Sequence, residues 1–167
     1  NFNPAPFLAD KRAAQQGYAT SEPYTIEKAT GLKPKVFLLA DEGYPGYATM
    51  VLASDSVIAK NPDAVKAFVA ASAKGWREYL DGDGKAADAL IRKDNPEMTQ
   101  DVLDQARAKL KSMRIVEGED AAPLGAMTDA RWKATIDFLK LTRLAKPNVD
   151  YSKAWSLGVV RDVKVLP

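Results

Sequence analysis

Two short turns near the start of the chain carry the side chains best suited to chemistry. Residues 17–24 and 40–47 each place a carboxylate close to a tyrosine, directly after a short apolar run. Carboxylates and phenols grouped where strands end are typical of a small-ligand cleft in an α/β protein. The two turns therefore predict a ligand-binding site made of Ser21, Glu22, Tyr24, Asp41, Tyr44 and Tyr47.

The residue types that the chain lacks limit what such a site can do. The sequence has no cysteine and no histidine, which excludes thiol catalysis, disulfides, a Ser-His-Asp triad and most zinc sites. The acids Asp41 and Glu42 suggest acid/base catalysis, but this also needs a nucleophile or a partner for the leaving group, and none is apparent. We therefore expect no catalytic residue, no metal and no cofactor, and we interpret Glu22 as a hydrogen-bond acceptor.

Each candidate residue also has a purely structural explanation. Ser21 is a suitable helix cap, Glu22 complements a helix dipole, and Tyr24 can pack against a neighbouring element. The second turn is equally typical of a solvated acidic loop with one buried tyrosine. Of the residues in that turn, Tyr44 and Tyr47 are the ones we expect to contact a ligand.

The charge distribution gives little support to nucleic acid or a membrane surface as a partner. The net charge is +2, and no segment concentrates lysine and arginine. No apolar run approaches the ~20 residues that span a bilayer. Because the sequence opens on Asn1-Phe2-Asn3-Pro4, without Met, we expect it to be the C-terminal portion of a longer chain.

The hydrophobic pattern predicts three strands, at residues 18–20, 35–40 and 47–53. After Lys35 the second run is continuously apolar, and it is bounded by Pro34 and Gly43, which is typical of a strand covered on both faces in a parallel sheet. Helices are predicted within residues 3–17 and 21–31, after Asn61, at residues 86–92, after Thr99 and after Thr128. The early alternation of helices and strands predicts an α/β protein with a mostly parallel sheet.

The long helix after Asn61 is expected to bury one side. Its apolar side chains recur at spacings of three and four residues, which predicts a buried stripe along the helix. The stripe consists of Val65, Phe68, Val69, Ser72, Trp76, Tyr79 and Leu80. Trp132 is likewise predicted to be a core residue, while Trp155 fits either a core or a ligand-binding role.

Three segments together resemble the C-terminal half of the NMT1/THI5-like solute-binding proteins, which are bacterial receptors for ABC importers. The segments are Gly17-Tyr-Ala-Thr-Ser-Glu-Pro-Tyr24, Lys33-Pro-Lys-Val-Phe-Leu-Leu-Ala-Asp41, and Asn61-Pro-Asp-Ala-Val-Lys-Ala-Phe68 with Gly75-Trp76 after it. Members of the family bind nitrate, taurine, alkyl sulfonates, thiamine-precursor pyrimidines or riboflavin. The resemblance covers nearly the whole chain.

The resemblance implies a type II periplasmic-binding-protein fold, with two lobes of mixed sheet flanked by helices and a ligand between them. Residues 1–46 would be part of the second lobe, and residues 47–167 would be the return crossover and the C-terminal part of the first lobe. Family chains are nearly twice this length, so the N-terminal part of the fold would be missing. The implied partners are a small-molecule ligand and an ABC transporter membrane permease, for a monomeric protein in the periplasm or lipid-anchored outside the cytoplasm.

The residues favour a planar heterocycle, such as a thiamine-precursor pyrimidine, over nitrate, taurine or an alkyl sulfonate. An anion needs arginine or lysine close by, and Lys11, Arg12 and Lys28 are interpreted as helix-surface residues. Two other functions remain open. One is pyrimidine synthesis by an enzyme of the THI5 type, which uses a histidine and a cysteine-rich motif that are absent from this chain. The other is a ligand-sensing domain.

Overall fold

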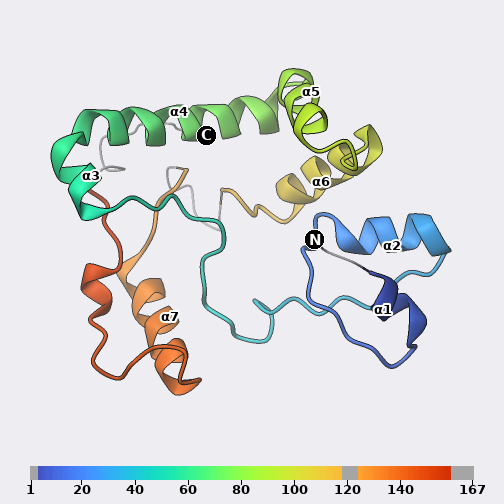
Figure 1. The fold of residues 1–167 in the computed structure, drawn as a ribbon, viewed down its shortest axis with the longest axis horizontal. Helices are drawn as coiled ribbons and strands as arrows, with labels where there is room; N and C mark the ends of the chain where they lie inside the picture. Colours follow the sequence, from blue (N-terminus) through green and yellow to red (C-terminus); the bar gives the residue numbers. More distant parts are fainter. Residues whose placement is uncertain (1–3, 118–123, 159–167) are drawn as a thin grey trace. The chain divides into compact units, whose positions relative to one another are not determined.

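The computed structural model describes residues 4–117 and 124–158, and the secondary structure of this part is helical (Figure 1). The described helices, in chain order, are α1 (Ala5–Ala9), α2 (Glu22–Thr30), α3 (Asp55–Lys60), α4 (Pro62–Asp81), α5 (Lys85–Asp94), α6 (Gln100–Ser112), α7 (Asp129–Leu141) and the short 3-10 helix η1 (Tyr151–Lys153). None of them is long and apolar enough to cross a membrane.

The helix ends follow from local capping chemistry. The side chain of Ser54 accepts a hydrogen bond from the Val57 N–H at the start of α3, and Thr128 accepts from the Arg131 N–H at the start of α7. At the other end of α2, Gly31 adopts a left-handed conformation with φ of 70°, and its N–H donates to the Glu27 carbonyl. Of these boundaries, the end of α2 at Gly31 and the start of α7 after Thr128 were predicted from the sequence.

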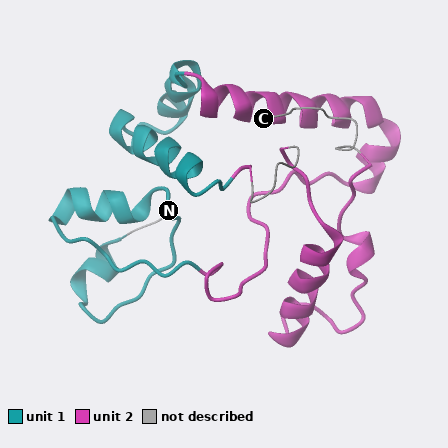
Figure 2. Cartoon of the chain, turned by 180° about the vertical axis from the view of Figure 1, so that it is seen from behind, with its two compact units in different colours: residues 1–38, 83–115 teal, residues 39–82, 116–167 magenta. Residues whose placement is uncertain are grey.

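The chain forms two compact units, each built from two separate stretches (Figure 2). Unit 1 comprises residues 1–38 and 83–115 and contains α1, α2, α5 and α6. Unit 2 comprises residues 39–82 and 116–167 and contains α3, α4, α7 and η1. The predicted lobe boundary at residue 46 stays a prediction.

In unit 1, buried apolar side chains come from two helices that contact each other. Ile26 of α2 and Val102 and Leu103 of α6 are buried, and α2 lies against α6. Asp88 of α5 is also buried, and the side-chain amide of Gln100 donates to its carboxylate at 2.7 Å. This bond ties the start of α6 to α5.

In unit 2, one buried cluster lies against α4. Ala73 and Leu124 are buried there, and Val69, Ala70 and Val116 pack around them. On α7, the side chains of Trp132, Thr135 and Ile136 are buried. The burial of Trp132 confirms its prediction as a core residue.

The structure contradicts the predicted α/β class with two lobes of mixed sheet. The runs predicted as strands at residues 18–20, 35–40 and 47–53 are turns or irregular backbone, and the described residues contain no strand. A strand requires a neighbouring segment that takes up its backbone N–H and C=O groups. Across residues 4–117 and 124–158 no segment pairs with these runs, and their side chains are largely solvent-exposed, with Phe37 65% and Leu52 95% exposed.

Several helix predictions also need correction. The first helix covers only Ala5–Ala9 and ends long before Gly17. Residues 55–60 form α3, a helix that was not predicted from the sequence. On α4, the predicted stripe is only partly right, because Leu80 is buried whereas Phe68 and Trp76 are exposed. The sequence also predicts an apolar alternation at Val159, Val163 and Val165, and these positions lie outside the described residues.

Candidate functional site

In the first predicted turn, Glu22 folds back over the preceding residues. Its Oε2 accepts a hydrogen bond from the Tyr18 N–H at 2.6 Å. Gly17 permits this close approach, because a Cβ there would lie 3.1 Å from the Glu22 side chain. The backbone N–H of Ser21 donates to the Tyr18 carbonyl at 3.0 Å, which tightens the same turn. The Glu22 carboxylate therefore stabilises the start of α2.

Tyr24 reaches across unit 1 to α6. Its hydroxyl donates to Asp101 Oδ2 at 2.7 Å, and the Lys28 ammonium donates to the same oxygen at 2.7 Å. The hydroxyl of Thr99 donates to the other carboxylate oxygen at 2.7 Å. These donors, with Lys28 the strongest, hold the pKa of Asp101 well below its usual range, and the hydrogen bond to Asp101 raises the pKa of Tyr24.

The three predicted ligand contacts of the first turn differ in whether their side chains already make hydrogen bonds within the protein. Glu22 and Tyr24 have polar partners within unit 1. Ser21 occupies the cap position of α2, but its side chain makes no capping hydrogen bond. A ligand role for these residues stays a prediction.

The second predicted turn reverses the chain just before the two tyrosines. The Gly43 N–H donates to the Ala40 carbonyl at 3.1 Å, and the Tyr44 N–H donates to the Leu39 carbonyl at 2.9 Å. Gly43 has a φ of 85°, a conformation that favours glycine. Asp41 and Glu42 are exposed at the tip of this turn.

Both tyrosines of the second turn pack on α7. The Tyr44 ring meets Phe138 edge-on, with ring centroids 5.2 Å apart, and remains 37% exposed. The Tyr47 ring lies 5.7 Å from that of Trp132, and the Tyr47 hydroxyl accepts a hydrogen bond from the Thr128 N–H at 2.9 Å. Tyr44 therefore keeps accessible ring surface, while Tyr47 is engaged at both its ring and its hydroxyl.

Arg131 holds the same turn and was not singled out from the sequence. Its Nε donates to the Pro45 carbonyl at 2.9 Å, and its Nη2 donates to the Gly46 carbonyl at 3.2 Å. Its guanidinium also lies over the Tyr47 ring, 4.3 Å from the centroid. One signal was available in the sequence: a cation in the first turn of a helix opposes the helix dipole and needs a compensating partner.

Trp155 packs on another aromatic residue of unit 2, and a ligand-binding role for it stays a prediction. Its ring stacks on Trp132, with centroids 6.4 Å apart and planes 10° from parallel. The indole N–H of Trp132 donates to the sulfur of Met127 at 3.3 Å. We call Tyr44, Tyr47, Trp132, Phe138 and Trp155 the aromatic cluster of unit 2. Tyr44 packs on Phe138, while Tyr47 and Trp155 both pack on Trp132, and Tyr44 keeps 37% of its surface exposed.

Comparison with known proteins places both predicted turns inside a family match. Residues 1–86 match the model of the family described as NMT1/THI5 like. The chain belongs to this family. The match includes Tyr44 and Tyr47, and it ends before Arg131 and the rest of α7.

This NMT1/THI5-like chain is also similar to a protein named for riboflavin binding. Over 154 residues it is 28% identical to the riboflavin-binding protein RibY of Chloroflexus aurantiacus, an alignment that covers 91% of this chain and 43% of that protein. The chain therefore spans less than half the length of this relative. No solved structure matches the chain significantly.

Proposed function

We propose that this chain is part of the solute-binding receptor of an ABC importer, and that the receptor binds a planar heterocycle without chemical change. The observation that carries the proposal is the similarity to a protein named for riboflavin binding, within a family to which this chain belongs. Riboflavin has a flat, fused ring system. A flat ligand suits a binding surface in which aromatic side chains supply the contacts.

The aromatic cluster of unit 2 supports this choice of ligand. Tyr44 offers a partly open ring beside Gly46, which has no side chain to obstruct the approach of a ligand. Tyr47 fixes the turn from behind, through Thr128 and Trp132. We propose that the Tyr44 ring stacks on the ligand and that Tyr47 contributes by holding the turn, with Asp41 available to accept hydrogen bonds from the ligand edge.

The charges near the cluster favour a neutral ligand over nitrate, taurine or an alkyl sulfonate. The cation nearest to Tyr47 is Arg131, and two of its donor nitrogens are already directed at backbone carbonyls. Binding a small anion would require Arg131 to leave these carbonyls and the Tyr47 ring. That exchange opposes anion binding at this position.

The remaining parts of the proposal follow from the family. The receptor acts outside the cytoplasm, in the periplasm or on a lipid anchor, and delivers its ligand to a membrane permease as a monomer. Ser21, Glu22 and Tyr24 stay proposed ligand contacts from unit 1. The family description also includes THI5, so the competing function is pyrimidine synthesis, which needs residue types that this sequence lacks.

A thermal-shift screen of the complete mature protein tests the proposal. The panel comprises riboflavin, a thiamine-precursor pyrimidine, nitrate, taurine and an alkyl sulfonate. A ligand that binds only the folded state stabilises it by RT ln(1 + [L]/Kd), about 2.7 kcal/mol at a hundredfold excess over Kd. We expect riboflavin or the pyrimidine to raise the Tm. Stabilisation by the anions alone would contradict the choice of ligand, and turnover of any compound would contradict the receptor function.

A further inference from the structure

The turn that follows α7 exposes an unusual combination of charge and apolar surface. Residues 140–147 contain three cations and no acid. Two leucines of the same segment are also strongly exposed, Leu141 by 82% and Leu144 by 77%. Together Lys140, Leu141, Arg143, Leu144 and Lys146 form what we call the α7 C-terminal patch.

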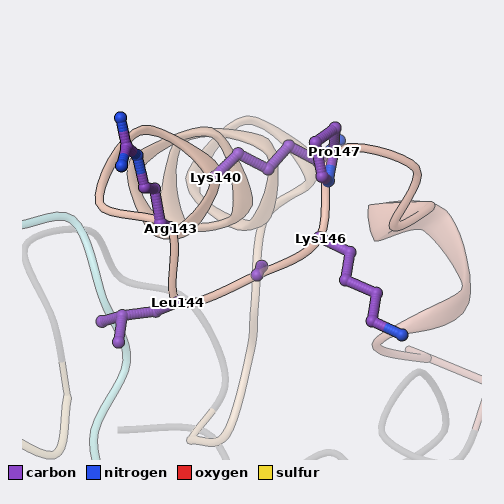
Figure 3. Close-up of a pocket in the computed structure, with 6 residues that line it drawn as sticks. Lys140, Arg143, Leu144, Lys146 and Pro147 are labelled. Carbon is purple, nitrogen blue, oxygen red and sulfur yellow. The ribbon is translucent and has the colours of Figure 1, made fainter.

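The patch surrounds a pocket. An open hollow of about 280 Å³ is lined by Lys140, Arg143, Leu144, Ala145, Lys146 and Pro147 (Figure 3). The backbone holds its shape, because the N–H groups of Leu144 and Ala145 both donate to the Leu139 carbonyl, at 2.8 and 2.9 Å. The hollow is therefore a feature of the helix end and its capping bonds.

Arg143 occupies a backbone position that disfavours its residue type. Its φ is 62°, in the left-handed region, where glycine normally ends a helix at little cost. Cations near a helix C-terminus complement the dipole, and Lys140 in the last turn of α7 already does so. Arg143 adds a further cation to this helix end, between two exposed leucines, and Arg114 beyond α6 adopts a similar φ of 49°.

The directions of the cationic side chains decide which kind of partner fits. Figure 3 shows Lys140, Arg143 and Lys146 leaving the turn in different directions, so they do not converge on one point. A single small anion such as phosphate needs convergent donors. A flat lipid surface would meet the cations and the leucines but would leave the hollow unfilled. Carboxylates spread over a protein surface, with an apolar side chain between them, match all of these features.

We propose that the α7 C-terminal patch is a docking surface for an acidic protein, which places carboxylates against the three cations and an apolar side chain in the hollow beside Leu144. The proposal concerns unit 2 alone and is independent of the ligand that the receptor binds. It assigns to Arg143 the role of a central anchor, a position that arginine often takes in protein interfaces.

The test measures binding of a fluorescent peptide of alternating glutamate and leucine to the full chain, by anisotropy at low and high salt. Its control peptide carries glutamine in place of glutamate. We expect the acidic peptide to bind, the control peptide to bind at least tenfold more weakly, and added salt to weaken the first interaction. Absence of binding by the acidic peptide, or equal binding of both peptides, would overturn the proposal.

The variant Arg143→Gly separates a docking role from a structural one. Because glycine suits a positive φ, this change should raise the denaturant midpoint of unfolding. It should also weaken the binding of the acidic peptide at least tenfold. Arg143→Lys should retain most of the binding, and Lys66→Ala, an exposed lysine on α4, should leave it unchanged. Unaltered peptide binding by Arg143→Gly would overturn the proposal. So would release of the peptide by inorganic phosphate beyond its release by sodium chloride at the same ionic strength, or release by phosphatidylglycerol vesicles at that ionic strength, with phosphatidylcholine vesicles as the control.

Discussion

Asp101 joins α6 to α2 through its carboxylate. Lys28, Thr99 and Tyr24 all donate to its carboxylate, and they lower its pKa from the ordinary aspartate value. A lowered folded-state pKa contributes stability above the unfolded value of about 3.9, and this stability is lost as the pH falls through the folded-state pKa. Because these side chains are partly exposed, the contribution is reduced by solvent screening.

The variant Asp101→Asn tests this ionic contact between α2 and α6. We expect lower stability than the unmodified chain at pH 7, and a difference between the two that shrinks as the pH falls below about 4. Urea unfolding at several pH values measures both effects. Asp94→Asn, at an exposed position at the end of α5, is the control and should change little. A difference that does not depend on pH would show that the ionised carboxylate is not what stabilises the contact.

The variant Gly46→Ala tests the role of the Tyr44 ring without removing the tyrosine. A Cβ at Gly46 would lie 2.6 Å from the outer atoms of that ring, so Gly46→Ala must displace the ring from Phe138. We expect several-fold weaker riboflavin binding by calorimetry, with a smaller change in urea stability. The control is Gly75→Ala on α4, where no atom lies within 4 Å of the added Cβ. It should raise helix stability by about 0.5–1 kcal/mol and leave riboflavin binding as it was.

At the scale of elements, α7 is the support on which the second turn rests. Arg131 joins the two by hydrogen bonds to Pro45 and Gly46 and by its contact with the Tyr47 ring. The hydroxyl of Thr135 adds a weaker bond to the Pro45 carbonyl at 3.3 Å. The turn therefore depends on side chains of a helix that lies far along the chain, since Arg131 follows Pro45 by 86 residues.

Truncating this arginine should release the turn from α7. For Arg131→Ala we expect a loss of about 1 kcal/mol in unfolding free energy, the net value of hydrogen bonds at a largely exposed site. Arg131→Lys should lose less unfolding free energy than Arg131→Ala but should remain less stable than the unmodified chain, since an ammonium cannot reproduce the planar fork of the guanidinium. Tryptophan fluorescence during urea unfolding reports the change, because Trp132 lies in the same cluster. If Arg92→Ala on α5 lowers the unfolding free energy as much as Arg131→Ala does, the loss reflects charge alone, and Arg131 does not anchor the turn to α7.

Secondary structure could be predicted where it depends on neighbouring residues. The starts of α4, α6 and α7 follow Asn61, Thr99 and Thr128, as predicted, and of these three only the Thr128 side chain accepts a capping hydrogen bond. Strand formation cannot be predicted in this way, and the three strands predicted from the sequence are wrong. An apolar run such as residues 35–40 becomes a strand only when another segment pairs with it, and no local pattern specifies that segment.

The same distinction applies to the candidate site. The grouping of Tyr44 and Tyr47 in one turn could be read from adjacent residues. The contacts of these tyrosines with Phe138, Trp132 and Arg131 could not be predicted from adjacent residues, since they join distant parts of the chain. The sequence also predicted Glu22 as a ligand contact, and in the structure its carboxylate accepts a hydrogen bond from its own turn.

At the scale of the whole molecule, family membership and the aromatic cluster support the central proposal, that the receptor holds a planar heterocycle against Tyr44. The most direct test titrates riboflavin into the complete mature protein and into its Tyr44→Ala and Tyr44→Phe variants, following the quenching of flavin fluorescence. We predict saturable quenching by the unmodified protein, at least tenfold weaker binding by Tyr44→Ala, and near-normal binding by Tyr44→Phe, which keeps the ring. Equal affinities for all three proteins, or displacement of riboflavin by nitrate or taurine, would contradict the claim.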